Sequence, residues 1–227
     1  YEQFARQYPQ ESGAQCSQAE KDGGTCPIAW EALMNATLFR LGMGQEEQAI
    51  ADADLFTRNY MRTMPRETAQ VRFAIGSLYE HTNRPGTMIL YYKRYLRDYA
   101  RIATVHQQMM AQVAIGRAYL RDDMDKPSDA KSAFEAVIRL WNNGAAVRQI
   151  SALEVPAQEK IRMTREMVDA VAESLFHLAE SKYKAFEAIA FPRYSGGRSL
   201  QRVNAWAQGD FARWMNQKMT ALQAAMA

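Results

Sequence analysis

Ile75-Gly76-Ser77-Leu78-Tyr79 returns forty residues later as Ile115-Gly116-Arg117-Ala118-Tyr119. In each copy a large apolar residue precedes a glycine, and a tyrosine follows the glycine by three positions. In a helix this spacing puts all three side chains on one face, where the glycine lets a neighbouring helix approach closely. A second copy at this distance predicts an internal repeat, and periods of about 20 to 50 residues are typical of solenoids.

The composition favours helices and an ordinary folded domain. The chain has 227 residues, of which 48% are hydrophobic and 23% charged, as in most globular proteins. Only 12 Gly and 7 Pro are available for turns, whereas Ala, Gln, Glu, Arg and Met are plentiful and favour helix. The formal net charge of +3 is too small to indicate nucleic acid or a membrane surface. Because no run of about 18 apolar residues is present, no membrane insertion is expected.

The start of the chain predicts a fragment. Tyr1–Pro9 has the pattern of the last turns of a helix that Pro9 ends, and neither an initiator Met nor a signal peptide precedes it. We therefore interpret the chain as cut from a longer precursor.

Two cysteines, Cys16 and Cys26, lie in a polar, glycine-containing loop over 10–26. A disulfide between them would close a loop of about ten residues, which stabilises on the order of 3 kcal/mol, and would indicate an oxidising compartment. The alternative is two free thiols in a cytoplasmic loop, but free Cys tends to be buried. The disulfide is the favoured interpretation. A zinc site is disfavoured, because no His and no second Cys pair lie nearby.

Apolar periodicity and its breakers divide residues 1–141 into helical hairpins. The divisions are a partial repeat over 1–9, the loop 10–26, and repeats over about 27–60, 67–99 and 104–141. The ending Phe56-Thr-Arg-Asn-Tyr60 matches Phe4-Ala-Arg-Gln-Tyr8 in register. The first complete unit departs from the pattern, because Thr37 stands where the next two units have glycine.

The pattern is looser in residues 142–227. Residues 142–155 are expected to form an irregular connection, and a long helix should follow from about Pro156 to Ala190. Part of this helix resembles the first helix of a degenerate fourth repeat, through Ala172, Leu175, Leu178, Ala179 and Tyr183. After a break, Leu200 to Met226 should form one long C-terminal helix with Val203, Trp206, Phe211, Trp214, Met215 and Leu222 facing inward.

The residues Ile75, Gly76 and Tyr79 and their copies resemble helix A of the tetratricopeptide repeat (TPR) family. The resemblance covers residues 1–141 well and implies an all-α, TPR-like helical-hairpin solenoid. The long polar loops between the repeats are similar in a general way to envelope TPR proteins of Gram-negative bacteria, including deltaproteobacterial ones. Together with the expected disulfide, this favours the periplasm, with the cytoplasm as the alternative.

The sequence carries no catalytic signature. His81, His106 and His177 lie in different units, and none has a metal-ligand partner at i+4. Neither a glycine-rich phosphate loop nor a nucleophile elbow is present. We therefore expect no enzymatic activity, no cofactor and no metal.

The strip Tyr91–Arg101 interleaves aromatic and basic residues, as single-stranded nucleic acid binders do. Tyr92, Tyr95 and Tyr99, however, follow the spacing of an inward helical stripe, which places the cations on the solvated face. Packing is the favoured interpretation, and nucleic acid is not an expected partner.

In TPR proteins the first helices of the repeats line a concave groove, whose outward residues select the partner. By register these residues are Met34, Leu38, Phe73, Ser77, Glu80, Met110, Val113, Arg117, Leu120 and Arg121. The basic clamp of chaperone-tail-binding TPRs is absent, because Met34, Phe73 and Val113 occupy its positions. The groove should be apolar with polar edges, and should suit an amphipathic helix or an extended apolar segment of another protein.

These residues predict a non-catalytic protein–protein interaction scaffold. The resemblance places it in a bacterial cell-envelope assembly, such as secretion, outer-membrane or gliding-motility machinery. The alternative is a purely structural solenoid segment whose groove is filled by its own chain or by adjacent repeats. A C-terminal helix lying in the groove would produce the same composition, so both interpretations stay open.

Overall fold

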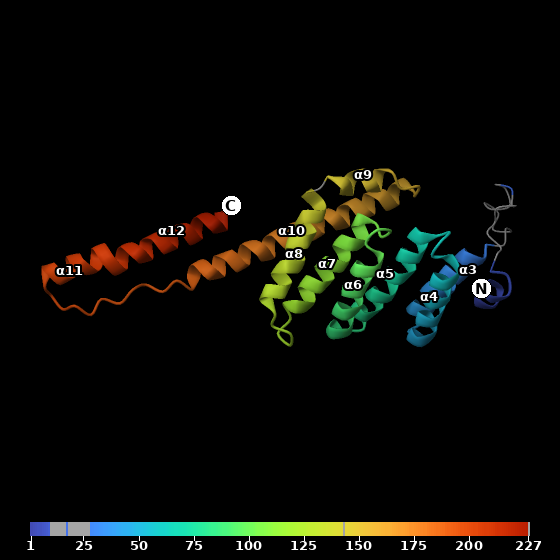
Figure 1. Ribbon diagram of the computed structural model, residues 1–227, viewed down its shortest axis with the longest axis horizontal. Coiled ribbons are helices and arrows are strands. Elements are labelled where there is room, and N and C mark those ends of the chain that lie inside the picture. The colour runs from blue at the N-terminus through green and yellow to red at the C-terminus, as the bar shows by residue number, and fades with distance from the viewer. Residues whose placement is uncertain (10–16, 18–27, 143, 227) are drawn as a thin grey trace.

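The computed structural model describes residues 1–9, 17, 28–142 and 144–226 (Figure 1). For residues 225 and 226 it describes the backbone only. Every regular element in these ranges is helical and none is a strand. The all-α class predicted from the sequence is therefore confirmed. The expected disulfide between Cys16 and Cys26 lies outside the described residues, as does most of the loop 10–26.

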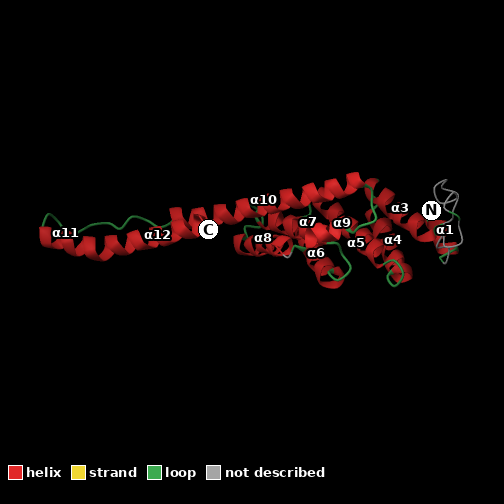
Figure 2. Ribbon diagram, turned by 90° about the horizontal axis from the view of Figure 1, so that it is seen from above, coloured by secondary structure: helices red, strands yellow, loops and turns green. Residues whose placement is uncertain are grey.

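The first part of the molecule is a row of helices packed side by side, which we call the helical stack (Figure 1, Figure 2). Each of these helices packs against the next one described along the chain, and α5 also packs against both α3 and α7. The helices of the stack are α1 (Glu2–Gln7), α3 (Ala29–Gly42), α4 (Glu46–Tyr60), α5 (Pro65–His81), α6 (Pro85–Tyr99), α7 (Val105–Tyr119) and α8 (Pro127–Asn142). The pairs α3–α4, α5–α6 and α7–α8 fall on the ranges 27–60, 67–99 and 104–141 to within two residues.

Each glycine of the repeated segment faces an aromatic ring from the following helix. A β-carbon on Gly76 would lie under 3.0 Å from the ring of Tyr92 on α6, and one on Gly116 under 3.0 Å from Phe134 on α8. Both rings are fully buried, so each glycine allows its two helices to pack closely. Tyr92 follows Gly76 by 16 residues and Phe134 follows Gly116 by 18. The connection before α8 is four residues longer than the one before α6, whereas α7 ends two residues sooner after its glycine than α5 does.

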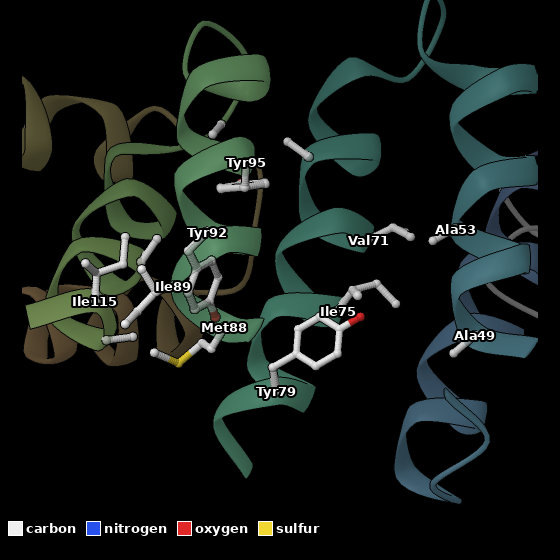
Figure 3. Packing of buried hydrophobic residues seen from close by; sticks show 14 of the residues in the cluster. Ala49, Ala53, Val71, Ile75, Tyr79, Met88, Ile89, Tyr92, Tyr95 and Ile115 are labelled. Carbon is white, nitrogen blue, oxygen red and sulfur yellow. The ribbon is translucent and has the colours of Figure 1, made fainter. Parts of the chain in front are cut away.

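In the first pair of helices, α3 and α4, the side chains at the two corresponding positions have different sizes. Thr37 stands in the place of the glycine, and its hydroxyl donates to the backbone oxygen of Leu33 at 2.9 Å. The position 16 residues after Thr37 is Ala53, which is also fully buried. Figure 3 shows Val71 on α5 pointing toward Ala53 on α4. The small residue thus lies on the second helix of this pair, which accommodates the missing glycine.

The connection after α8 contains a short helix, α9 (Ala145–Ser151), so the expectation of an irregular stretch over 142–155 is wrong. Gly144 adopts a φ of +61°, in the left-handed region that glycine occupies without strain. A helix therefore begins directly after this glycine. Ala146 and Ile150, one helical turn apart, are buried against the neighbouring helices.

The long helix α10 (Ala157–Glu187) packs against α7, α8 and α9, and its contacts with α8 extend to His177, whose ring stacks on Phe134. Its C-terminal end continues beyond the stack (Figure 1, Figure 2). Its buried residues are Met167, Ala170 and Ser174. The stripe that resembles a degenerate fourth repeat behaves differently, because Ala172, Leu175, Ala179 and Tyr183 are exposed and only Leu178 is half-buried. The face of α10 that packs is therefore not the face that the resemblance selected.

The chain then folds back along α10 to form a projecting structure, which we call the arm: residues 185–226. It comprises the end of α10, the connection 188–199, α11 (Leu200–Trp206), the π-helical turn η1 (Ala207–Phe211) and α12 (Ala212–Met226). α12 packs against α10, as Figure 1 shows. The single helix predicted over Leu200–Met226 is thus interrupted by one wide turn.

Aromatic side chains meet around this π-turn. Hydrogen bonds in such a turn join residues five apart, and the rings of Trp206 and Phe211 lie 5.4 Å apart between centroids. Phe211 stacks on Trp214 at 5.6 Å. Val203 and these three residues are half-buried, as their expected inward orientation requires, but Met215 and Leu222 are exposed. The inward stripe predicted for this helix is therefore wrong at its C-terminal end.

Candidate partner-binding site

The outward face of α7, predicted to line an open groove, is partly covered by α10. Val113 is only 2% exposed and belongs to an apolar cluster with Met167 and Ala170 of α10. Met110 packs against the same cluster and is half-buried. The register placed both residues on the outward face of α7, but the position of α10, forty to sixty residues further on, closes that face.

Two polar contacts hold α10 on α7. The guanidinium of Arg117 donates through Nε to Glu173 Oε1 at 2.6 Å and through Nη2 to Oε2 at 2.5 Å. Nearer the N-terminal ends of both helices, His106 Nε2 lies 2.6 Å from Glu166 Oε2. These contacts flank the apolar cluster, so the position of α10 is defined by one ion pair and one hydrogen bond to a carboxylate as well as by packing.

His106 is buried, and its Nδ1 has no hydrogen-bond partner among the described residues. Burial lowers the pKa of this imidazole, and the hydrogen bond and charge of Glu166 only partly oppose that change. Glu166 also accepts from Arg162 Nη1 at 2.6 Å. The neutral imidazole is therefore the favoured form at neutral pH.

In the middle of the predicted groove, the expected groove residues pack on α6 instead of facing an open space. Phe73 packs between two tyrosines of α6, with centroid distances of 5.5 Å to Tyr92 and 5.9 Å to Tyr95. Ser77 Oγ lies 3.3 Å from the Tyr92 hydroxyl. Phe73 and Ser77 are half-buried, and these contacts give them a structural role in joining α5 to α6.

The N-terminal end of the predicted groove offers two apolar side chains. Met34 is half-buried against the core, whereas Leu38 is exposed. Its neighbour Phe39, which the register did not select, is more exposed still, and its ring lies 6.3 Å from that of Tyr1. The exposure of Leu38 agrees with its outward register, whereas that of Phe39 was missed because Phe39 lies next to this stripe rather than on it.

Three predicted groove residues, Glu80, Arg117 and Arg121, converge on one cavity of about 200 Å³ between α5, α6 and α7. The floor of this cavity, which we call the rim cavity, is apolar and the edge is polar. The floor residues are Tyr79, Met88, Ala114 and Ala118. The remaining lining residues are Asn83, Arg84 and Pro85, which lie in or next to the turn between α5 and α6.

Arginines at this edge reach back from one helical pair to the preceding one. Arg121 Nη1 donates to Asn83 Oδ1 at 2.7 Å, and Arg84 Nη2 donates to Glu46 Oε2 at 2.5 Å. Arg40 pairs with Glu2 in the same direction. All three contacts span 38 residues, so this edge repeats with the helical pairs. Asn83 and Arg84 were not predicted from the sequence, although polar residues that recur 38 positions apart were a usable signal.

The three cations at the rim cavity are not equally neutralised. Arg84 pairs with Glu46 and lies 4.8 Å above the ring of Tyr79, and Arg117 is engaged by Glu173. Arg121 faces the neutral amide of Asn83 and an exposed carboxylate, Asp123, at 3.0 Å. Among the described residues Arg121 is therefore the rim cation with the weakest carboxylate partnership.

Leu120, also predicted for the groove, belongs to a different cavity. It lines a space of about 250 Å³ with Phe134 of α8 and His177 of α10, and the Phe134 ring stacks on the His177 ring at 4.8 Å. Leu120 and Arg121 are consecutive but lie at separate sites. The structure thus divides the single groove predicted from register.

Within the described ranges no group of three or more His, Cys, Asp and Glu side chains is placed to hold a metal ion. Among those ranges no helix combines the length and apolar character needed to cross a bilayer. Comparison of the chain with protein-family models, curated proteins and solved structures finds no match. The function of the chain is therefore inferred from the rim cavity and from the chain's own residues.

Proposed function

We propose that the chain is a non-catalytic protein–protein interaction scaffold of TPR type that binds a segment of a partner protein at the rim cavity. The observation that carries the proposal is the convergence of Glu80, Arg117 and Arg121 on one cavity with an apolar floor. Glu80 and Arg117 come from two first helices, α5 and α7, where the resemblance expects the recognition surface, and Arg121 lies just after the end of α7.

The size and lining of the cavity fit an anchoring side chain. Its volume of about 200 Å³ is below the ~300–1,000 Å³ of pockets that enclose small molecules. Tyrosine and arginine are enriched among residues that dominate binding energy at protein interfaces, and Tyr79 and Arg121 are both present here. We expect an extended segment whose apolar side chain enters the cavity and whose acidic side chain lies next to Arg121.

A purely structural role is the second candidate, and the covering of α7 by α10 favours it. Val113 and Met110 are removed from solvent by the same chain, so this part of the groove has no room for a partner. The two roles concern different segments of the groove. A scaffold that binds at the rim cavity can still fill its own groove further along.

Location in a bacterial envelope assembly, for secretion, outer-membrane assembly or gliding motility, is proposed on narrower grounds. It rests on the disulfide expected between Cys16 and Cys26 and on the general likeness to envelope TPR proteins. Thiol titration of the unreduced protein tests it: no reactive thiol is expected, and two would favour the cytoplasm.

Selection of peptides from a displayed random library on the immobilised protein tests the binding function. Enriched peptides should share an apolar residue close to an acidic one. Their affinity, measured by fluorescence anisotropy, should fall at least tenfold in Arg121→Glu, because a charge pair at a cavity edge becomes a repulsion. Arg139→Glu on α8 is the matched control, since Arg139 is similarly exposed and lies away from the rim cavity.

Two outcomes would contradict the proposed binding site. One is the absence of any enriched sequence class after repeated selection. The other is binding that Arg121→Glu and Arg139→Glu weaken equally, since that would indicate a general charge effect. Circular dichroism melts of both variants serve as the folding control, and unchanged melting is expected because both side chains are exposed.

A further inference from the structure

The net positive charge of the chain is concentrated in its last forty residues. Residues 188–227 contain five of the 28 Lys and Arg but only one of the 25 Asp and Glu. Their formal net charge is therefore +4, whereas residues 1–187 carry −1 and the whole chain +3. Such an asymmetry indicates a region that meets an anionic surface.

Three of these cations lie at the distal end of the arm, where the connection 188–199 meets α11. Arg193, Arg198 and Arg202 are all exposed, and none forms an ion pair with any other described residue. The one acidic residue of the region, Asp210, already pairs with Arg213. The arginines at this end therefore present uncompensated charge to solvent.

An exposed apolar side chain accompanies these arginines. Leu200 is 79% exposed, the largest value for an apolar side chain in the described residues, and lies between Arg198 and Arg202 in sequence. We call Arg193, Arg198, Leu200 and Arg202 the arm tip.

The arm tip is held in shape by aromatic packing just behind it. Phe191 meets Trp214 edge-on at 4.9 Å, and Tyr194 packs on Trp206 at 5.5 Å. The Tyr194 hydroxyl also donates to the backbone oxygen of Gly197 at 2.7 Å, closing the turn. Because the arm extends beyond the helical stack (Figure 1, Figure 2), a flat surface can reach the tip without meeting the stack.

From this placement we propose that the arm tip binds peripherally to the surface of an anionic lipid bilayer. Arginines gain affinity from anionic headgroups, and an apolar side chain between them enters the boundary with the acyl chains. The contact involves side chains at the surface and no spanning segment.

A lipid surface fits this tip better than a nucleic acid does. Single-stranded nucleic acid requires free aromatic faces along a basic groove. Here the exposed rings of Phe191 and Tyr194 pack on Trp214 and Trp206, and the two tryptophans are half-buried. The most exposed apolar residue, Leu200, is aliphatic and offers no face for stacking. The binding proposed here is independent of the rim cavity, which lies in the helical stack.

Flotation with lipid vesicles tests the proposal on the whole chain. Vesicles of phosphatidylcholine with about 30% phosphatidylglycerol should bind the protein, and vesicles of phosphatidylcholine alone should not. The double variant Arg198→Glu/Arg202→Glu should lower the partition coefficient at least tenfold, since each basic residue near an anionic surface contributes severalfold. Leu200→Ser should lower it several-fold.

Matched variants in the stack control for bulk charge and surface hydrophobicity. Arg58→Glu/Arg94→Glu changes the net charge equally at exposed positions of α4 and α6. Leu90→Ser removes a leucine that is 73% exposed on α6. These controls should bind vesicles within twofold of the unchanged protein. All variants replace exposed residues, so their far-ultraviolet circular dichroism should be unchanged.

Several outcomes would overturn the proposal. These are the absence of binding to anionic vesicles, equal binding to neutral ones, and equal losses in the stack controls. If a single-stranded oligonucleotide bound instead, and the Arg198→Glu/Arg202→Glu variant abolished that binding, the tip would be a nucleic-acid contact.

Discussion

The helical stack and the arm both carry many large apolar side chains, but they bury them to different degrees. In the stack, Phe56, Tyr92, Tyr95 and Phe134 are fully buried. In α11, η1 and α12 no residue with a described side chain is buried, although this segment holds two tryptophans and a phenylalanine. Helix α5 packs against α3, α4, α6 and α7, whereas the packing of α12 in the described part of the chain is mainly against η1 and α10. The number of neighbouring helices, rather than the hydrophobicity of the segment, decides burial.

This difference implies two levels of stability within one chain. Segments with few buried contacts open locally at a lower free-energy cost than the core. The arm has a single layer of packing, and an aromatic cluster joins α11, η1 and the connection 188–199. We expect the arm to open while the stack stays folded.

Hydrogen exchange should give the largest contrast between the two regions. Backbone amides in the middle of α7 should exchange at least a hundredfold more slowly, relative to their intrinsic rates, than amides in the middle of α12. That factor corresponds to about 3 kcal/mol in opening free energy. Mass spectrometry after timed labelling measures it, and equal protection in α7 and α12 would refute the division into two levels.

Glycine substitutions should give the second-largest difference between the stack and the arm. Gly76→Ala should lower the free energy of unfolding by about 2 kcal/mol, because the new β-carbon meets the buried Tyr92 ring. Gly209→Ala in η1 has nothing within 4 Å of its β-carbon, so it should cost the stack nothing. Urea titration followed by circular dichroism measures both, and Gly86→Ala, equally free of contacts, is the control within α6. A neutral Gly76→Ala would remove the argument for close packing.

Acid should loosen the junction between the stack and α10. Because burial holds the pKa of His106 below its ordinary value, the unfolded chain binds the proton more readily. The stability associated with the neutral imidazole is thus present above about pH 6.5 and is lost as pH falls through the folded-state pKa. The facing groups are Glu166, Arg162 and Glu159.

Urea midpoints between pH 7 and 5 check this expectation. The midpoint of the unchanged protein should fall on acidification, and His106→Gln should reduce that dependence. His81→Gln is the matched control, since His81 is an exposed histidine on α5. An identical pH profile in all three proteins would show that His106 does not contribute.

The smallest expected effect concerns the ion pair that joins α7 to α10. Arg117→Ala should cost less than about 1 kcal/mol, because the Arg117 side chain is largely exposed and solvent screens the pair with Glu173. Thermal melts at low and high salt measure the change, with Lys131→Ala on α8 as the surface control. A cost of several kcal/mol would mean that α10 is held mainly by charge rather than by Val113, Met167 and Ala170.

Local patterns in the sequence predicted the helices and the tight glycine contacts, whereas contacts between distant segments escaped it. Gly76 and Gly116 identify close helix approaches because glycine leaves a specific space. Val113 lies on the outward face of α7, as its register requires, but its burial depends on α10, whose path helical periodicity cannot specify.

The candidate site could be predicted only in part for a related reason. Glu80, Arg117 and Arg121 were identified from their helical register, and the structure brings them to one cavity. Asn83 and Arg84 lie in a turn, where helical register gives no orientation. α9 was missed because Gly144 is a strong stop signal, and the sequence does not indicate how soon a helix resumes after it.

The wide turn η1 has a consequence for everything that follows it. An α-helix advances about 100° for each residue, and a π-turn absorbs roughly one extra residue. Every side chain of α12 is therefore rotated by about that angle from its place in an uninterrupted helix. Lys218 Nζ reaches the backbone oxygen of Phe186 at 2.6 Å and lies 4.1 Å above its ring. In an uninterrupted α-helix, Gln217 would take the angular position that Lys218 has here. The π-turn therefore determines which side chains of α12 face α10.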